Sequence, residues 1–384
     1  MVAQFPREAK VKLNRPIPRL TACVLAALVA AAGPAAAGPS LVVDLDGGRV
    51  LSQEDAFQRW YPASLSKLMT TYVVFRAVAA GEVTLTSPVR ITKNAAKEPP
   101  SKMGYPPGSV LTLDSALKII MVKSANDVAT AIGESIAGSE KGFAARMNAE
   151  SRRLGMIGSH WVNAHGLHDE GQYSTAHDLA VLAAAIRRDF PQHAGYFRLE
   201  GIVDGKTTMP NHNDLIGRFE GADGMKTGYT CPAGFNLIAS ATRDGRTLVA
   251  VVIGERSTEE RAVKAADLLE AGFASTAAGA TTLASMTPSG DGLDQPHNMR
   301  SRICTKAAYK ARLDAGEIDS HGRVIVSSPH LRDKPLRAPV LVAVGLGGAT
   351  GPRSPYASDE VEYADVPIPT PRPDHATVRA SALQ

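Results

Sequence analysis

Three kinds of feature are missing from the sequence, and each absence excludes a class of function. No cluster of basic residues is interleaved with aromatic residues, which make up only 5% of the chain, so a nucleic-acid partner is not expected. After the N-terminal region, no stretch stays apolar over the roughly 20 residues that a membrane span requires. The H-E-x-x-H motif of zinc peptidases is also absent.

The N-terminus has the pattern of a secretory signal peptide. Five basic residues precede a short apolar run at 20–32: Arg7, Lys10, Lys12, Arg15 and Arg19. Residues 35–37 are Ala-Ala-Ala, which fits an A-x-A cleavage site. We expect residues 1–37 to be removed and the chain to be exported, to the bacterial periplasm or outside the cell. The run is too short for a retained membrane anchor, and Cys23 lies too near its start for a lipoprotein signal.

Hydrophobic periodicity and turn residues predict an α+β domain over residues 38–275. Strands are expected at 39–46, from Arg49 onward, and as an antiparallel meander at 224–230, 235–241 and 247–253. Helices are expected at 64–80, 113–122, 126–136, 143–154, 175–187 and 258–272. Short polar side chains mark their starts, with Asn126 or Asp127, Thr175 and Thr258 as expected N-caps.

Residues 276–384 differ in composition from the rest of the chain. Small residues and proline dominate to about Gln295, and four prolines alternate with other residues between Pro367 and Pro373. Only 323–327 and 339–344 have the character of strands. We expect a largely irregular, low-complexity and partly disordered extension with little core of its own. Its last residues show no apolar helical face that would anchor it to a membrane.

Ser64 and Lys67 are the first candidates for catalysis. They are three residues apart at the start of a predicted helix, so their Cβ atoms share one face at about 5–6 Å. A Lys amine at this distance accepts the proton of the Ser hydroxyl if burial or another cation keeps the amine neutral. Taken alone, the pair is equally compatible with a solvated Ser and Lys on a helix surface.

Two further motifs follow Ser64-x-x-Lys67 in order. Ser124-Ala125-Asn126 falls in a break between two predicted helices, and Lys226-Thr227-Gly228 falls on the first strand of the meander. With their flanking residues, these motifs resemble those of the serine D-alanyl-D-alanine carboxypeptidases, the low-molecular-mass penicillin-binding proteins. His165-Gly166-Leu167, 173–179 and Asn211-His212-Asn213 also resemble this family. The resemblance covers roughly residues 39–274 and does not extend to the tail.

The resemblance implies a β-lactamase/transpeptidase-like fold, an antiparallel sheet flanked by helices with a helical subdomain, and a role for each motif residue. Ser64 is the expected nucleophile, Lys67 its base, and Ser124 a proton relay to the leaving amine. The expected substrate-binding residues are Asn126, Lys226, Thr227, Gly228 and Tyr229. The backbone N–H groups of Ser64 and Tyr229 would form the oxyanion hole. The substrate would be a peptidoglycan stem peptide, β-lactams would inhibit, and the chemistry requires neither metal nor organic cofactor.

Four other functions are compatible with part of this pattern. A class A-type β-lactamase shares the motifs, but neither Glu150 nor Glu170 lies in a Glu-x-x-Leu-Asn context. A peptidoglycan D,D-endopeptidase stays open, because only the rim of the cleft would differ. A zinc peptidase built on His165, His168 and His177 is disfavoured, since no helical i, i+4 pair is present. A catalytically inactive wall-binding protein is disfavoured because the whole polar set is present.

Cys231 and Cys304 remain after signal cleavage. In an oxidising compartment, two cysteines in one chain are more often paired than free, so a disulfide is expected. It would fasten the start of the extension beside the Lys226-Thr227-Gly228 strand. Two separate thiols are the alternative.

Overall fold

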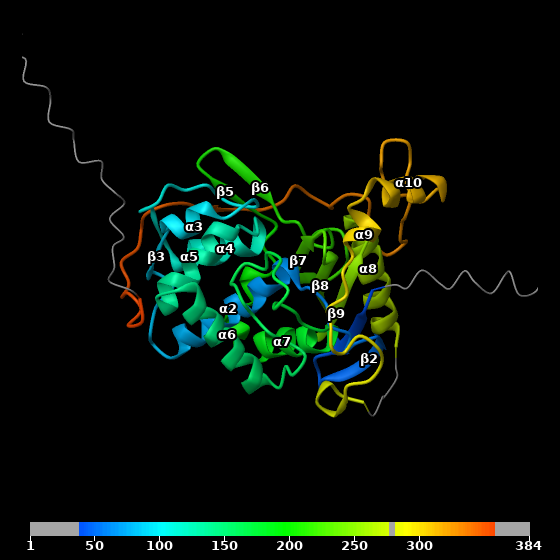
Figure 1. The fold of residues 1–384 in the computed structure, drawn as a ribbon, viewed down its shortest axis with the longest axis horizontal. Helices are drawn as coiled ribbons and strands as arrows, with labels where there is room; N and C mark the ends of the chain where they lie inside the picture. The colour runs from blue at the N-terminus through cyan, green and yellow to red at the C-terminus, as the bar shows by residue number, and fades with distance from the viewer. Residues whose placement is uncertain (1–37, 276–280, 358–384) are drawn as a thin grey trace, which may run out of the picture. The chain divides into compact units, whose positions relative to one another are not determined.

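A five-stranded antiparallel sheet forms the centre of the fold, in the order β2-β1-β9-β8-β7. The computed structural model describes residues 38–275 and 281–357 (Figure 1). The strands are β1 (Ser40–Asp44), β2 (Arg49–Glu54), β7 (Ala222–Thr230), β8 (Gly234–Arg243) and β9 (Arg246–Glu255). The predicted signal peptide and the proline-rich stretch from Pro367 lie outside the described residues. β7 is an edge strand, so one row of its backbone groups faces away from the sheet.

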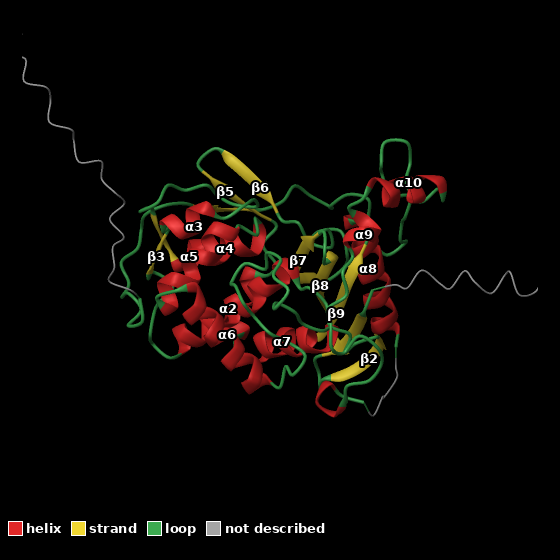
Figure 2. Cartoon of the chain, in the orientation of Figure 1, coloured by secondary structure: helices red, strands yellow, loops and turns green. Residues whose placement is uncertain are grey.

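Alternating side chains of the strands enter two separate apolar cores, one on each face of the sheet. On β9, Val249, Val251 and Ile253 belong to the larger core, and Leu248, Ala250 and Val252 to the smaller one. This is the period of two that a strand imposes on its side chains. Helix α8 (Thr258–Ala274) packs into the smaller core, and α2 (Ser66–Ala79) and α7 (Ala176–Asp189) pack into the larger one (Figure 2).

A helical subdomain extends the larger core away from the sheet. It contains α4 (Leu113–Val122), α5 (Asn126–Ala137) and α6 (Glu140–Leu154), with the short α3 (Lys93–Lys97) and the hairpin of β3 (Pro88–Arg90) and β4 (Val110–Thr112) beside them. Thr175 caps α7 as expected, its hydroxyl accepting from Asp178 N at 3.0 Å. Two N-cap predictions were wrong. α5 is preceded by Ala125, and Ser257, not Thr258, caps α8.

Asp127 is not the cap of α5 because its carboxylate is used elsewhere. Its oxygens accept from Met103 N and Gly104 N, so they join the start of α5 to the loop before β4. A 3-10 helix, η2 (Pro191–Tyr196), follows α7 and leads into a hairpin of β5 (Gly201–Asp204) and β6 (Thr207–Pro210). The sequence did not predict this hairpin.

The described part of the extension lies along the domain rather than apart from it. It contains η3 (Leu283–Ser285), α9 (Arg300–Ile303), α10 (Lys306–Asp314) and β10 (Leu341–Val344), which pairs in parallel with β5. Leu283 and Met299 belong to the larger core, and Leu331 to the smaller one. The expected strand at 339–344 corresponds to β10. Residues 323–327 form no strand, and only Val324 makes an isolated bridge, to Ile318.

The extension is held at both of its described ends and by a covalent bond. Cys231 and Cys304 form a disulfide, as expected, with Cα atoms 5.8 Å apart. Farther along, Arg332 exchanges hydrogen bonds with Arg218, and Ser354 Oγ donates to Ile136 O at the end of α5. The chain therefore passes from the sheet side, beside β7 and α8, to the helical subdomain (Figure 1). Among the described residues, no helix is long and apolar enough to span a membrane.

Candidate active site

Ser64 lies where the edge of the sheet meets the helices. It belongs to a short 3-10 helix, η1 (Ala63–Leu65), which continues directly into α2. Gly228 on β7 faces this turn, and a Cβ added to it would lie 2.9 Å from Pro62 O and 3.0 Å from Ser64 N. Only glycine allows β7 to approach the Ser64 backbone this closely. From β8, the buried Asn236 donates its amide to Pro62 O at 3.2 Å, which fixes the approach to η1.

Lys67 is held by three oxygen atoms. Its Nζ lies 3.0 Å from Ser64 Oγ, 2.9 Å from Asn126 Oδ1 and 2.6 Å from His165 O. The Asn126 oxygen is oriented toward Lys67 because Nδ2 donates to Pro99 O at 3.0 Å. A carbonyl-type oxygen only accepts, so the two hydrogens of a neutral amine are directed to Asn126 and His165. The lone pair is then left for the Ser64 hydroxyl.

The surroundings of Lys67 favour this neutral form. Its side chain is fully buried, and burial holds the Lys67 pKa well below 10.5. The positive charge of Lys226 lowers this pKa further, while the carboxylates of Glu98 and Asp127 act in the opposite direction. The Ser64/Lys67 hypothesis requires either burial or a neighbouring cation, and the structure provides both.

Ser124 and Asn126 come from the break between α4 and α5. Ser124 has φ 61°, a left-handed conformation uncommon outside glycine and asparagine, and this geometry separates the two helices. Its Oγ is buried and has no hydrogen-bond partner among the described residues. The backbone of Asn126 is held by Ser101 O at 2.7 Å. A buried hydroxyl without a partner costs stability unless something else uses it, so Ser124 is available to a bound molecule.

Lys226 places a second buried cation on the edge strand. Its side chain is 2% exposed and donates to Thr227 O at 3.1 Å. Burial lowers the Lys226 pKa to about 7, and the charge of Arg261 on α8 adds to this effect. Arg261 is itself 4% exposed, and burial lowers its pKa to about 10. The sequence singled out Lys226 but gave no indication that α8 directs Arg261 to this place.

Tyr229 ends the motif at the rim. Its side chain is exposed and stacks on Phe235 with ring centroids 4.2 Å apart. The Tyr229 hydroxyl lies 3.3 Å from Cys304 Sγ and 3.7 Å from Cys231 Sγ. The disulfide therefore contacts the Tyr229 side chain and helps to hold it in place. Thr227 is 6% exposed on the same strand. β7 therefore brings Lys226, Thr227, Gly228 and Tyr229 to one edge, beside Ser64.

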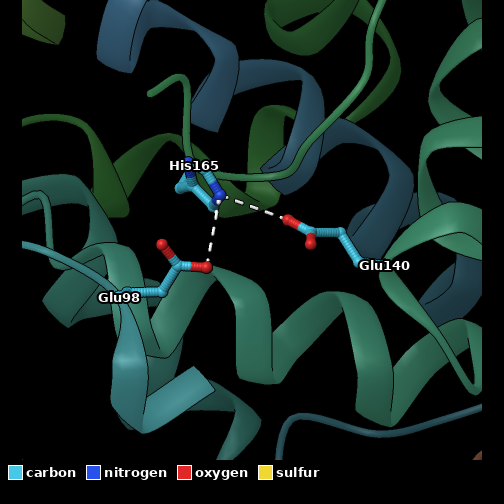
Figure 3. A group of neighbouring side chains, drawn as sticks. All are labelled: Glu98, Glu140 and His165. Carbon is cyan, nitrogen blue, oxygen red and sulfur yellow. Dashed lines mark ion pairs between the residues drawn. The ribbon is translucent and has the colours of Figure 1, made fainter. Parts of the chain in front are cut away.

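His165 forms a separate polar group with two carboxylates (Figure 3). Its Nε2 lies 3.4 Å from Glu98 Oε1 and 3.2 Å from Glu140 Oε1. These three residues form a group with potential metal-ligand atoms within 4.8 Å of one another. The other ring nitrogen argues against a metal. Leu167 N–H donates to His165 Nδ1 at 3.0 Å, so Nδ1 carries no proton.

A neutral imidazole has one N–H, which here must be on Nε2. A metal at Nε2 would require the proton to move to Nδ1, where it would face the Leu167 N–H. Histidines that bind metals instead donate their second N–H to an acceptor. Glu98, Glu140 and His165 therefore fit a group of imidazole–carboxylate ion-pair contacts better than a metal centre.

The structure does not bring the three histidines of the zinc hypothesis to one centre. His168 packs edge-on against Tyr61, with ring centroids 4.7 Å apart. His177 lies 3.0 Å from Asp178 Oδ1 and 3.0 Å from Leu283 O, and stacks on Phe57. Among the described residues, neither belongs to the Glu98, Glu140 and His165 group.

The geometry indicates the type of enzyme site. The site combines a serine beside a buried amine, a second serine without a hydrogen-bond partner among the described residues, and a buried lysine on an edge strand. This is the set of groups expected of an activated-serine site of the Ser-x-x-Lys type. The comparisons with known proteins agree with this type of site. Residues 27–257 match the family model described as D-alanyl-D-alanine carboxypeptidase, and the chain belongs to that family.

Relatives and solved structures support the family and the predicted fold. The chain is 35% identical over 240 residues to "D-alanyl-D-alanine carboxypeptidase DacC" of Escherichia coli (strain K12), covering 61% of this chain and 60% of the relative. Penicillin binding protein 5 from Haemophilus influenzae is similar in structure, with TM-score 0.60 and 34% identity over 62% of this chain and 71% of that chain. The Streptomyces K15 DD-transpeptidase aligns with TM-score 0.58 and 25% identity over 62% of this chain and 98% of that chain, so the expected transpeptidase-like fold is confirmed.

The match does not extend over the whole of either partner. The chain spans 60% of the length of DacC and 61% of the length of "D-alanyl-D-alanine carboxypeptidase DacF" of Bacillus subtilis (strain 168). The matched family region ends at residue 257. The extension, from residue 276 on, lies beyond it.

Proposed function

We propose that the protein is a serine D,D-carboxypeptidase that removes the terminal D-alanine from peptidoglycan pentapeptide stems. The observation that carries the proposal is the contact set of Lys67. Its Nζ directs two hydrogens to Asn126 Oδ1 and His165 O and lies 3.0 Å from Ser64 Oγ. A buried amine in this position is suited to take the serine proton.

In the proposed acylation, Ser64 Oγ attacks the carbonyl carbon between the two D-alanines while Lys67 Nζ takes its proton. The negative charge that develops on the carbonyl oxygen is stabilised by the backbone N–H groups of Ser64 and Tyr229. The C–N bond then breaks, and the proton on Lys67 passes through the Ser124 hydroxyl to the leaving amine, so that Ser124 and Lys67 both return to their starting forms. The products are an ester on Ser64 and free D-alanine, and water hydrolyses the ester.

Lys226 and Thr227 are the proposed recognition site for the terminal carboxylate. A cation and a hydroxyl on the edge strand match the charge and the acceptor oxygens of that group. The free edge of β7 also offers backbone groups to an extended peptide. β-Lactams, which carry a carboxylate beside a reactive amide, would acylate Ser64 in the same way and would act as inhibitors. The proposed location is the periplasm, after removal of the predicted signal peptide.

Covalent labelling with a fluorescent penicillin tests the proposal directly. We expect one adduct per chain on wild-type protein and none on Ser64→Ala, with intact mass to count the adducts. Ser52→Ala is the matched control, because Ser52 is an exposed serine on β2. An unlabelled wild-type chain, or full labelling of Ser64→Ala, would contradict the proposal.

Product analysis then identifies the reaction. Mature protein is incubated with a pentapeptide that ends in D-Ala-D-Ala and with a cross-linked muropeptide. Release of D-alanine from the pentapeptide supports the carboxypeptidase. Cleavage of the cross-link alone would replace it by a D,D-endopeptidase that uses the same serine.

A further inference from the structure

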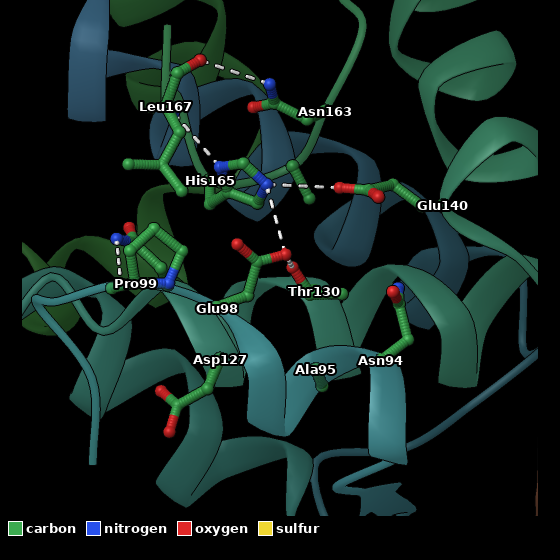
Figure 4. A network of polar contacts seen from close by, with 12 residues as sticks. Asn94, Ala95, Glu98, Pro99, Asp127, Thr130, Glu140, Asn163, His165 and Leu167 are labelled. Atoms are coloured by element: carbon green, nitrogen blue, oxygen red, sulfur yellow. Dashed lines mark hydrogen bonds and ion pairs between the residues drawn. The ribbon is translucent and has the colours of Figure 1, made fainter. Parts of the chain in front are cut away.

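Glu98 and Pro99 are adjacent in the chain, and between them they reach both oxygens that accept from Lys67. Pro99 O accepts from Asn126 Nδ2, which turns the Asn126 oxygen toward Lys67. The Glu98 side chain reaches the ring of His165, whose carbonyl oxygen is the other acceptor. Figure 4 shows this dipeptide between α5 and the loop of His165.

We propose that Glu98 is a positioning residue for the catalytic lysine, which acts through His165 by holding the carbonyl oxygen of that residue against Lys67 Nζ. The inference rests on the proposed function, because it assigns a supporting group to the same base. It adds a residue that lies outside the three sequence motifs.

The His165 ring is held in one tautomer, with its proton on Nε2. Because Leu167 N–H donates to Nδ1, the single proton of the neutral ring is on Nε2, which points at Glu98 Oε1 and Glu140 Oε1. The ring is 5% exposed, so water does not replace these carboxylates freely. Acceptors on one side and a donor on the other fix the ring, and with it the backbone of His165.

The Glu98 side chain is itself held in place by Thr130. Its Oε1 accepts from Thr130 Oγ1 at 2.9 Å, and Thr130 is one turn after Asn126 on α5. Glu98 therefore ties the loop of His165 to the helix that carries Asn126. Both acceptors of Lys67 are held in one connected set of contacts, which keeps the geometry around Nζ constant.

Glu140 has a lesser role in this arrangement. Its Oε1 is buried, lies 3.2 Å from His165 Nε2 and has no hydrogen-bond partner among the described residues. It lies at the start of α6, whereas Glu98 accepts from Thr130 on α5. Glu140 supports the proton on Nε2, and Glu98 supplies the link to the catalytic residues.

The charge of Glu98 affects a measurable quantity, the pKa of Lys67. A purely structural role for Glu98 would leave this pKa unchanged. The charged groups that face Lys67 are Lys226 from β7, Asp127 from α5, and Glu98 from the segment after α3. The Glu98 carboxylate opposes the fall in the Lys67 pKa. Glu98→Gln keeps the shape and the acceptor for Thr130 but removes the charge, so the Lys67 pKa falls further.

The experiment compares wild type, Glu98→Gln and Glu98→Ala by NMR and by the rate of penicillin acylation. Imidazole ¹⁵N shifts report the His165 tautomer and ¹³Cε shifts the titration of Lys67, both without substrate; Lys67→Arg assigns the lysine signal. We expect the Nε2–H tautomer in wild type and Glu98→Gln, with a lower Lys67 pKa in Glu98→Gln. We expect the maximal acylation rate of Glu98→Ala to fall roughly tenfold or more, because the base is misplaced.

Glu134→Gln is the matched control. Glu134 is on α5, the helix of Thr130, and its carboxylate also accepts from a threonine hydroxyl, that of Thr92, and from Asn94 Nδ2. We expect wild-type rates and titration from it, and thermal unfolding checks that every variant is folded. A wild-type acylation rate in folded Glu98→Ala overturns the inference. If wild type is not acylated at all, the proposed function fails. In that case the NMR titration still tests the inference, and an unchanged Lys67 pKa in both Glu98 variants overturns it.

Discussion

Arg261 on α8 lies behind Lys226 on β7, and both cations are buried, at 4% and 2% exposure. Arg261 donates to His212 O at 3.2 Å and lies over the ring of Phe235, 5.8 Å from its centroid. Burial lowers the Arg261 pKa, and the carboxylates of Asp214 and Glu259 oppose this shift. The Arg261 charge in turn adds to the burial that lowers the Lys226 pKa to about 7.

This pair predicts a pH dependence for carboxylate recognition. Burial, and then the charge of Arg261, lower the Lys226 pKa to about 7, so Lys226 is charged below this pH and neutral above it. Since kcat/KM reports the free enzyme, we expect kcat/KM for a D-Ala-D-Ala peptide to fall as the pH rises through about 7. Arg261→Gln removes the like charge, which raises the Lys226 pKa and moves this fall to higher pH.

The control for this prediction is a substrate with an amidated C-terminus. It has no carboxylate for Lys226, so its slower reaction is expected to lack the fall above neutral pH. An identical alkaline limb for the acid and the amide would show that a different group titrates.

Ser124→Ala separates catalysis from stability. Ser124 Oγ is buried without a hydrogen-bond partner among the described residues, so its removal breaks no bond in the free protein. Alanine and serine have similar costs in the left-handed backbone, and we expect the free energy of unfolding to stay within about 0.5 kcal/mol of wild type. The release of D-alanine should fall by about 10²-fold or more, as for the loss of a proton-transfer group.

Denaturant unfolding and the rate of D-alanine release are the two measurements. A large loss of stability would mean that the Ser124 hydroxyl has a structural partner. A wild-type rate would exclude it from proton transfer.

The disulfide is expected to contribute to stability through the unfolded state. Cys231 and Cys304 are 73 positions apart, and the chain-entropy treatment gives about 4 kcal/mol for a loop of this length. The double variant Cys231→Ser/Cys304→Ser is therefore expected to unfold at a lower guanidinium concentration than oxidised wild type. Reduced wild type is the matched control and should unfold close to the double variant.

Because the bridge supports Tyr229, the same variant should also react more slowly with penicillin. Equal unfolding midpoints for the oxidised protein and the double variant would show that the other contacts of the extension already provide the constraint.

The parts of the site that the sequence predicted are those set by local geometry. Ser64 and Lys67 are three residues apart, and the turn from η1 into α2 brings Nζ to 3.0 Å from Oγ. The strands were predicted because successive side chains of a strand point to opposite faces of the sheet, as Leu248 and Val249 do. The signals in both cases lie within a few residues of one another.

The parts that the sequence did not predict depend on partners far along the chain. His165 O meets Lys67 across 98 positions, and no periodicity marks a backbone carbonyl as a ligand of an amine. Glu98 and Glu140 belong to none of the three sequence motifs. The sequence predicted a strand at 339–344 but not its partner β5, and nothing in either segment indicated that Leu341 would lie opposite Gly201. Their pairing is decided by the domain surface on which they meet.

The path of the extension has a consequence for the order in which the molecule assembles. β5 and β6 are made long before β10, so during synthesis or export this hairpin forms first and gains its third strand only when residues 341–344 arrive. Contacts between such distant segments are slow to form because a long loop must close. The proposed catalytic and substrate-binding residues all precede residue 230. In a nascent chain, the proposed nucleophile, base and carboxylate-binding residues are therefore all present before the extension, which runs from the sheet to the helical subdomain, makes its contacts.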